Sequence, residues 1–172
     1  MKVIASYNIK GGVGKTATAV NLSYLAAWEG SPTLVWDLDP QGAASFYFRV
    51  KPKVKGGTVR LLKRKRELDD AIKATDYPRL DLIPADFSYR NMDLTLEHFG
   101  KSSNRLRKLI KPLRDEYDVG SFQLSTDARS KAVFDVIVDA ARGRGVDHRA
   151  GDAPLLAGLT GGLVAATVLG FL

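Results

Sequence analysis

A glycine-rich segment near the amino end constrains the fold of this chain more than any other feature. Residues Lys10 to Thr16 read Lys-Gly-Gly-Val-Gly-Lys-Thr. The β-branched and aromatic run from Val3 to Ile9 predicts a strand before this segment, and the stretch from Thr16 to Glu29 predicts a helix after it. A break at Gly30-Ser31-Pro32 ends the helix, and the apolar run from Thr33 to Leu38 predicts a second strand. This order indicates a β-α-β unit with both strands in one parallel sheet.

The remaining sequence predicts more elements of the same kinds. We expect helices over Glu67–Ala74, Tyr89–Phe99 and Leu106–Leu113, and strands over Leu80–Ile83 and Val133–Val138. The chain has 172 residues, 45% of them hydrophobic, which is enough apolar material for one core. The predicted fold class is therefore α/β, a mostly parallel sheet flanked by helices.

The glycine-rich segment has the chemistry of a phosphate site. Successive backbone N–H groups of such a turn point inward, glycine lets the backbone come close, and the N-terminus of the following helix adds a partial positive charge. We expect Lys15 to reach the β- and γ-phosphates of a nucleotide and the Thr16 hydroxyl to complete the coordination of Mg²⁺. The alternative is a glycine-rich turn with two solvated lysines, which the flanking strand and helix make less favourable.

The segment departs from the ordinary phosphate-loop motif, which has a glycine five positions before Gly14. This chain has Ile9 there, followed by a second lysine, Lys10. The sequence Lys-Gly-Gly-x-Gly-Lys-Thr resembles the deviant Walker A motif of the ParA/MinD family of dimeric P-loop ATPases. In that family the extra lysine crosses the dimer interface to touch the partner's nucleotide, and the resemblance assigns this role to Lys10. The resemblance assigns nucleotide binding to Gly11, Gly12, Val13, Gly14, Lys15, Thr16 and Ala17.

One position inside the motif differs from the family pattern. The family usually has a second hydroxyl after Thr16, which contacts the α-phosphate, and this chain has Ala17. A hydrogen bond to a charged partner contributes about 1.5–3 kcal/mol, so we expect nucleotide affinity to be roughly ten- to a hundredfold weaker.

A second stretch, Thr33 to Gly42, also resembles the family, with aspartates ending the second strand. In the family the first aspartate supports the magnesium site and the second positions the attacking water. The resemblance therefore assigns these roles to Asp37 and Asp39, with Lys10, Lys15 and Asp39 carrying catalysis. The alternative is that the two carboxylates only cap the following turn. Further matches at Leu80–Ala85 and Leu106–Asp118 extend the resemblance to about residue 119.

The resemblance stops after Tyr117-Asp118-Val119. Family members continue with an apolar strand that ends in Asp-x-Pro-Pro, whereas Gly120 to Lys131 is polar here and predicts no strand. The strand-like run from Phe134 to Asp139 comes later. Asp139 is then either a displaced metal-supporting aspartate or an ordinary carboxylate at a strand end. We expect the fold to be incomplete on its C-terminal side.

The chain changes character after Asp139, and Ala153 to Leu172 carries no charge. Codons compatible with Ala140 to Gly151, read one base later, can spell a family-like continuation. We therefore divide the chain into a partial ParA-like nucleotide-binding domain, 1–139, and an atypical tail, 140–172, that is out of frame or disordered. The competing hypothesis is a membrane-spanning helix over 153–172, which four glycines and Pro154 disfavour.

The charge balance favours contact with polyanions. Lys and Arg number 26 against 19 Asp and Glu, a formal charge of +7. Cations gather between Lys51 and Arg66 and again between Lys101 and Arg114. Such clusters can follow a phosphate backbone without reading sequence, and the alternative is an ordinary solvated surface.

The resemblance implies a ParA-like, Mg²⁺-dependent ATPase of plasmid or chromosome partitioning. It implies a homodimer formed through ATP, nonspecific DNA binding and a ParB-like partner. Because no basic-then-apolar leader precedes Val3, we expect the cytoplasm, and the resemblance implies association with the nucleoid. The alternatives are a MinD-like regulator at a membrane and a truncated, noncatalytic fragment. The chain has no cysteine, which excludes the relatives that carry iron–sulfur clusters.

Overall fold

The computed structural model describes residues 1–8, 10–63, 68–100, 102–125, 132–137 and 165–169. The strands are β1 (Lys2–Tyr7), β2 (Thr33–Asp37), β3 (Lys73–Ala74), β4 (Leu80–Ile83), β5 (Val119–Gln123) and β6 (Ala165–Leu169). The α-helices are α1 (Lys15–Trp28), α2 (Ala43–Tyr47), α3 (Gly57–Leu61), α5 (Met92–Phe99) and α6 (Ser102–Ile110). Two 3₁₀ helices are η1 (Phe87–Asn91) and η2 (Lys111–Asp115), and residues 132–137 are also helical.

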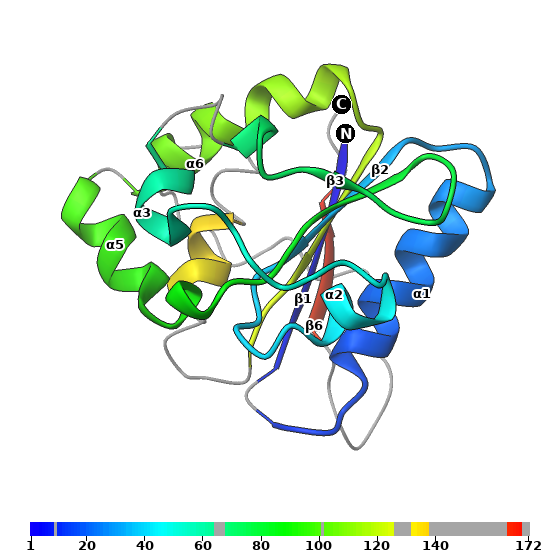
Figure 1. Cartoon of the computed structure of the whole chain (residues 1–172), viewed down its shortest axis with the longest axis horizontal. Coiled ribbons are helices and arrows are strands. Elements are labelled where there is room, and N and C mark those ends of the chain that lie inside the picture. The colour runs from blue at the N-terminus through cyan, green and yellow to red at the C-terminus, as the bar shows by residue number, and fades with distance from the viewer. Residues whose placement is uncertain (9, 64–67, 101, 126–131, 138–164, 170–172) are drawn as a thin grey trace.

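One mixed sheet organises the chain, with the strand order β3-β4-β2-β5-β1-β6. The four middle strands are parallel, and the two edge strands, β3 and β6, run antiparallel to their neighbours. All five residues of β2 are buried, as expected for an inner strand covered on both faces. Figure 1 shows α1 and α2 on one side of the sheet and α3, α5 and α6 on the other. The predicted α/β fold, mostly parallel and flanked by helices, is confirmed.

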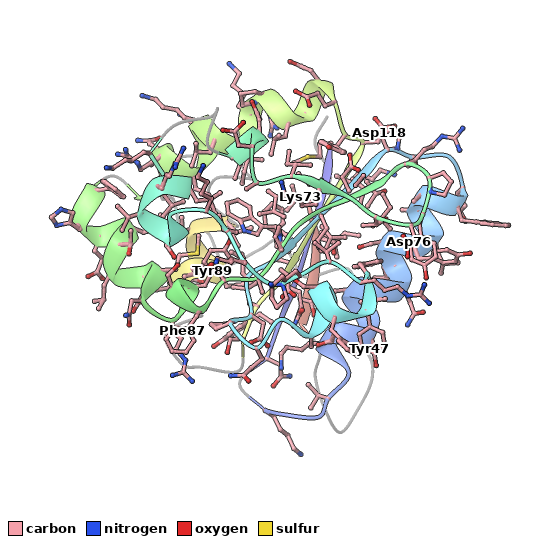
Figure 2. The ribbon with its side chains drawn as sticks, viewed as in Figure 1. Tyr47, Lys73, Asp76, Phe87, Tyr89 and Asp118 are labelled. Carbon is pink, nitrogen blue, oxygen red and sulfur yellow. The ribbon has the colours of Figure 1, made fainter. Side chains whose placement is uncertain are left out.

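The two faces of the sheet have separate apolar clusters because successive strand side chains alternate between faces. Leu34 and Trp36 of β2 belong to the larger cluster, which includes buried leucines of α3, α5 and α6. Val35, between them, belongs to the smaller cluster with Ala27 of α1 and Phe48. Figure 2 shows the side chains of both layers, and Tyr89 of η1 lies in the core whereas Phe87 of the same helix is exposed.

Helix α1 packs closely on the sheet because its inner row consists of small side chains. Ala19, Ser23 and Ala27 are buried and continue, at a spacing of four, the line that begins with Lys15. The helix contacts β5, β1 and β2. This packing fixes the helix N-terminus beside the ends of three parallel strands.

The polar segment after Val119 is a central strand, so the prediction that Gly120 to Lys131 forms no strand is wrong for its first part. Strand β5 lies between β2 and β1, and all its residues are buried. Its neighbours supply the backbone hydrogen bonds, and Phe122 packs against Trp36 with ring centroids 6.0 Å apart. Gly120 leaves room for the Met1 side chain, which would lie only 3.1 Å from an added Cβ. Tertiary context here overrides local composition.

The strand predicted over Val133–Val138 is a second correction, because residues 132–137 are helical. Val133 and Ile137 are buried in the larger cluster, and Phe134 stacks on Tyr7 with ring centroids 5.3 Å apart. A short apolar run with buried positions four apart fits a helix face as well as a strand. Val138 and Asp139 lie outside the described residues.

Other boundaries differ by small amounts. The predicted strand Leu80–Ile83 is β4, as expected. Within the range Glu67–Ala74, where a helix was predicted, residues 68 and 69 are helical among those described, and Lys73–Ala74 instead pairs with β4 as β3. The helix predicted over Leu106–Leu113 ends as α6 at Ile110, and Pro112 lies in η2, since proline has no N–H for the α-helical ladder.

The tail is described only at 165–169, where β6 pairs antiparallel with β1. This segment is therefore a strand, not part of a membrane-spanning helix. In the described parts of the chain, no helix combines the length and apolar character needed to cross a membrane.

Candidate functional site

The loop between β1 and α1 presents bare backbone. Gly12 and Gly14 have φ angles of 71° and 86°, in the left-handed region that strains residues with a Cβ. An added Cβ at Gly11, Gly12 or Gly14 would meet no atom within 4 Å, so the space over these residues is open. The Asn8 side chain accepts a hydrogen bond from the Lys10 amide at 2.8 Å, which holds the start of the loop. Backbone N–H groups here are accessible to a ligand.

The two lysines of the segment have different environments. Lys15, the first residue of α1, is buried, and its carbonyl accepts a hydrogen bond from the Ser6 hydroxyl. Burial lowers the pKa of Lys15 from its usual range, and the nearby carboxylate of Asp39 opposes that shift. Lys10 is exposed at the surface. Lys15 therefore faces the site of its own chain, whereas Lys10 is open to another molecule.

Asp37 ends β2 as a fully buried carboxylate fixed by hydrogen bonds. Its Oδ2 accepts from the Ser45 amide at 2.7 Å and the Ser45 hydroxyl at 2.8 Å, and its Oδ1 accepts from the Asp39 amide at 3.3 Å. The Ser45 hydroxyl in turn accepts from the Ala85 amide at 2.9 Å. Burial raises the pKa of Asp37 to about 6, against the lowering effect of the Ser45 hydrogen bonds. Sequence analysis missed Ser45, since no motif includes it.

Asp39 lies in the turn that follows β2. Its Oδ1 accepts a hydrogen bond from the Gln41 amide at 3.0 Å, an Asx-turn contact. Its Oδ2 lies 3.5 Å from the side-chain nitrogen of Gln123. Asp39 thus caps the turn with one oxygen, and its other oxygen faces the end of β5, where a role toward a water stays a prediction.

Gln123, the last residue of β5, reaches the same place and was not identified from the sequence. It is fully buried, and its Nε2 lies 3.1 Å from Thr16 Oγ1, to which it donates. The signal was its position six residues after Tyr117, where the strand expected from the resemblance would end. Asp139, which the sequence offered as the metal-supporting aspartate at a strand end, lies outside the described residues, as does Ile9.

The structure brings together the segment from Lys10 to Ala17 and the pair Asp37 and Asp39, since β1, β5 and β2 are parallel neighbours. Their carboxyl ends meet at one edge of the sheet, where such folds bind ligands. Val13 is half-buried and Ala17 is exposed near the start of α1. The site therefore combines open amides, a buried ammonium, one hydroxyl and two carboxylates.

These groups fit a nucleotide with Mg²⁺. Over the described ranges, no group of three or more acidic or histidine side chains could hold a metal ion. Magnesium is usually bound by one or two carboxylates together with substrate phosphates, so hydroxyl and carboxylate oxygens beside a phosphate loop are a suitable donor set. Gln123 departs from this donor set of oxygens, because its neutral amide lies between Thr16 and Asp39.

A separate cavity of about 740 Å³ lies beside the segment that follows α2. One acidic residue, Asp70, lines it together with six cations. The cations are Arg49, Lys51, Lys53, Lys55, Arg60 and Lys73. Part of the basic cluster predicted between Lys51 and Arg66 therefore lines a hollow in the surface, which we call the basic cavity.

Comparisons with known proteins agree with this geometry. A family model described as an AAA domain matches residues 1–125. The sporulation initiation inhibitor protein Soj of Bacillus subtilis is 36% identical over 118 residues, which are 68% of this chain and 47% of Soj. The chromosome partitioning protein ParA of Caulobacter vibrioides is 36% identical over 115 residues, which are 66% of this chain and 43% of ParA. The chain spans about half the length of the curated relatives it matches.

Among solved structures, cobyrinic acid a,c-diamide synthase from Mycobacterium smegmatis with a bound ATP analog and magnesium is similar to this chain. The TM-score is 0.64 at 26% identity, with 73% of this chain and 51% of the synthase covered.

Proposed function

This chain belongs to the ParA/MinD-type P-loop ATPases, and from that premise we propose that it binds ATP with Mg²⁺ and hydrolyses it to ADP and phosphate. The observation that carries the proposal is the convergence of Lys15, Thr16, Asp37 and Asp39 at one edge of the sheet. The relatives include partition proteins, so we assign the ATPase to plasmid or chromosome partitioning.

Each group has a chemical task in this proposal. The loop amides and the Lys15 ammonium hold the β- and γ-phosphates and offset their charge. Thr16 and Asp37 hold the metal, with Ser45 fixing the orientation of Asp37. Asp39 has lone pairs beyond its contact with Gln41 and orients the attacking water. Magnesium, when bound, neutralises charge that develops on the phosphate oxygens.

We extend the proposal to assembly. Lys10 is exposed at the start of the loop, where an ammonium can reach the phosphates of a second copy. A homodimer formed through ATP would use this residue, and a ParB-like partner would stimulate hydrolysis. We place the protein in the cytoplasm, on the nucleoid.

We assign nonspecific DNA binding to the basic cavity. Six cations line it against one acidic residue, and a concave positive surface concentrates the electrostatic attraction for a phosphate backbone. Contacts of this kind fix position without reading base sequence.

A second candidate is a fragment that binds nucleotide without turnover. It is favoured by Ala17 and Gln123, two departures inside the site. We treat residues 1–139 as the nucleotide-binding part in both cases; of the tail, 140–172, residues 165–169 add the edge strand β6 to its sheet.

Steady-state ATP hydrolysis and nucleotide binding by the full chain, beside the Lys15→Ala variant, test the two candidates. The ATPase proposal expects Mg²⁺-dependent phosphate release that the variant lacks. Binding that depends on Lys15 without release of phosphate would favour the fragment. Binding and release that are indifferent to Lys15 would exclude this site.

A further inference from the structure

Gln123 occupies a position that connects the two halves of the candidate site. In the sheet it lies level with Ser6 of β1 on one side and with Asp37 of β2 on the other. Strand β1 leads into the glycine-rich loop, and β2 ends in the aspartate pair. A fully buried side chain at this position can therefore contact both halves.

The contacts of its amide group are specific. Nε2 donates to Thr16 Oγ1 at 3.1 Å and faces Asp39 Oδ2 at 3.5 Å. One NH₂ group has two N–H donors, so it can serve both oxygens. With the amide reversed, Oε1 would face the Asp39 carboxylate, and two acceptors would then meet. The Asp39 carboxylate therefore favours the orientation in which the NH₂ group points into the site.

This orientation changes the hydroxyl on which a metal would depend. Thr16 Oγ1 accepts a hydrogen bond from Gln123, which uses one of its two lone pairs. The amide carries no charge and adds no attraction for a cation. Its N–H groups instead donate to Thr16 Oγ1 and face Asp39 Oδ2, so both oxygens are held without a cation. Gln123 Oε1 is buried and has no partner among the described residues, so the side chain is fixed from its nitrogen end alone.

We infer that Gln123 is a positioning residue whose amide holds Thr16 and Asp39 in place without a cation, so that nucleotide binding by this chain depends little on Mg²⁺. The inference rests on the proposed nucleotide site and specifies how that site is regulated. Affinity is then carried by the loop amides and Lys15, which need no metal.

The matched variants are Gln123→Glu, which keeps the shape and adds a charge, and Gln123→Met, which keeps the length and removes the hydrogen bonds. A carboxylate beside Asp39 creates two like charges that a divalent cation relieves. The glutamate variant should therefore acquire dependence on Mg²⁺. The methionine variant should bind nucleotide more weakly with and without the metal, in unchanged proportion.

The experiment is a titration of the full chain with a fluorescent ADP derivative, in Mg²⁺ and in EDTA at equal ionic strength. We expect the Kd in EDTA to exceed that in Mg²⁺ by less than about threefold for the unaltered chain and by more than about tenfold for Gln123→Glu. Thermal unfolding without nucleotide provides a second measurement, in which Mg²⁺ should raise the Tm of Gln123→Glu alone. If burial of the new carboxylate prevents folding, the shorter Gln123→Asp takes its place with the same expected dependence on Mg²⁺. The Kd ratio of the unaltered chain tests the inference in either case.

A ratio above about tenfold in the unaltered chain would overturn the inference and leave the nucleotide site standing. An unchanged ratio in folded Gln123→Glu would do the same. Absence of nucleotide binding under both conditions would overturn the proposed function, and the inference with it.

Discussion

Ser45 donates two hydrogen bonds to a single oxygen of Asp37, one from its amide and one from its hydroxyl. The hydroxyl also accepts from the Ala85 amide, so one side chain ties α2, the end of β2 and the exit of β4 together. This arrangement keeps a buried carboxylate in a fixed orientation through hydrogen bonds.

Ser45→Ala should lower the free energy of unfolding by about 1–3 kcal/mol, because it leaves the Ala85 N–H and part of the Asp37 carboxylate without partners. Urea denaturation measures the change. Ser23→Ala is the matched control: Ser23 is equally buried, but its hydroxyl only bonds back to the Ala19 carbonyl within α1. Equal effects of the two substitutions would contradict the role given to Ser45.

Lys15→Ala should reduce nucleotide affinity by roughly ten- to a hundredfold, the loss expected for one or more charge-assisted hydrogen bonds. Titration with a fluorescent nucleotide measures it. Lys10→Ala should leave the affinity of a single chain nearly unchanged, because Lys10 is exposed, and should abolish ATP-dependent dimerisation in analytical ultracentrifugation. The distinction between the two lysines fails if both variants bind nucleotide equally poorly.

Ala17→Thr should strengthen nucleotide binding by roughly tenfold, since it supplies a hydroxyl where the family contacts the α-phosphate. Ala17 is exposed in the first turn of α1, so the larger side chain meets no packing obstacle. Ala17→Val carries the same β-branched shape without the hydroxyl and should bind like the unaltered chain. A gain of equal size in both variants would assign the effect to the helix instead.

The stability of the chain should fall on the acid side through Asp86. Partial burial alone would raise the pKa of Asp86, but hydrogen bonds from the Ser88 hydroxyl, the Val54 amide and the Ser88 amide lower it below its usual value. Because the pKa is lower in the folded state, the ionised carboxylate stabilises the folded chain above about pH 4, and this contribution is lost as the pH falls through the folded pKa.

Asp86→Asn should therefore be less stable than the unaltered chain at neutral pH, with a difference that narrows toward low pH in urea denaturation. Asp76→Asn is the control, since Asp76 pairs with Arg49 at 3.5 Å on the open surface and should change little at any pH. A difference that is constant with pH would show that the Asp86 charge plays no part.

DNA binding through the basic cavity should weaken steeply with salt, because each neutralised phosphate releases counterions. Lys55→Glu should lower both the affinity and the slope of log affinity against log salt concentration, measured by fluorescence anisotropy with a duplex of arbitrary sequence. Lys2→Glu makes the same change in net charge at an exposed residue outside the cavity. If the two variants lose affinity equally, net charge and not the cavity explains the binding.

The β-α-β unit at the start of the chain was predictable because one local sequence pattern indicates both its structure and its chemistry. Lys10 to Thr16 connects the strand β1 to the helix α1, and the aspartates lie at the end of the second strand as predicted. Strand β5 was not predictable from its own residues, because Val-Gly-Ser-Phe-Gln becomes a strand only between two neighbours and under a helix. Missing β5 also meant missing Gln123.

Ser45 and residues 132–137 were missed for different reasons. The link from Ser45 to Asp37 joins residues eight apart through a tertiary turn, and no local pattern encodes it. The apolar run at 132–137 fits the spacing of a helix face as well as that of a strand. In the structure it is helical and contacts Tyr7, more than a hundred residues away, which no local pattern shows.

Helix α1 places four buried residues in one row, and the first of them is Lys15. A helix of 14 residues is about 21 Å long and moves as a stiff rod. Added bulk at Ala27, at the far end of the row, would therefore tilt the rod and shift the ammonium at its head. The position of the Lys15 ammonium at the start of α1 therefore depends on the small size of a side chain three turns away.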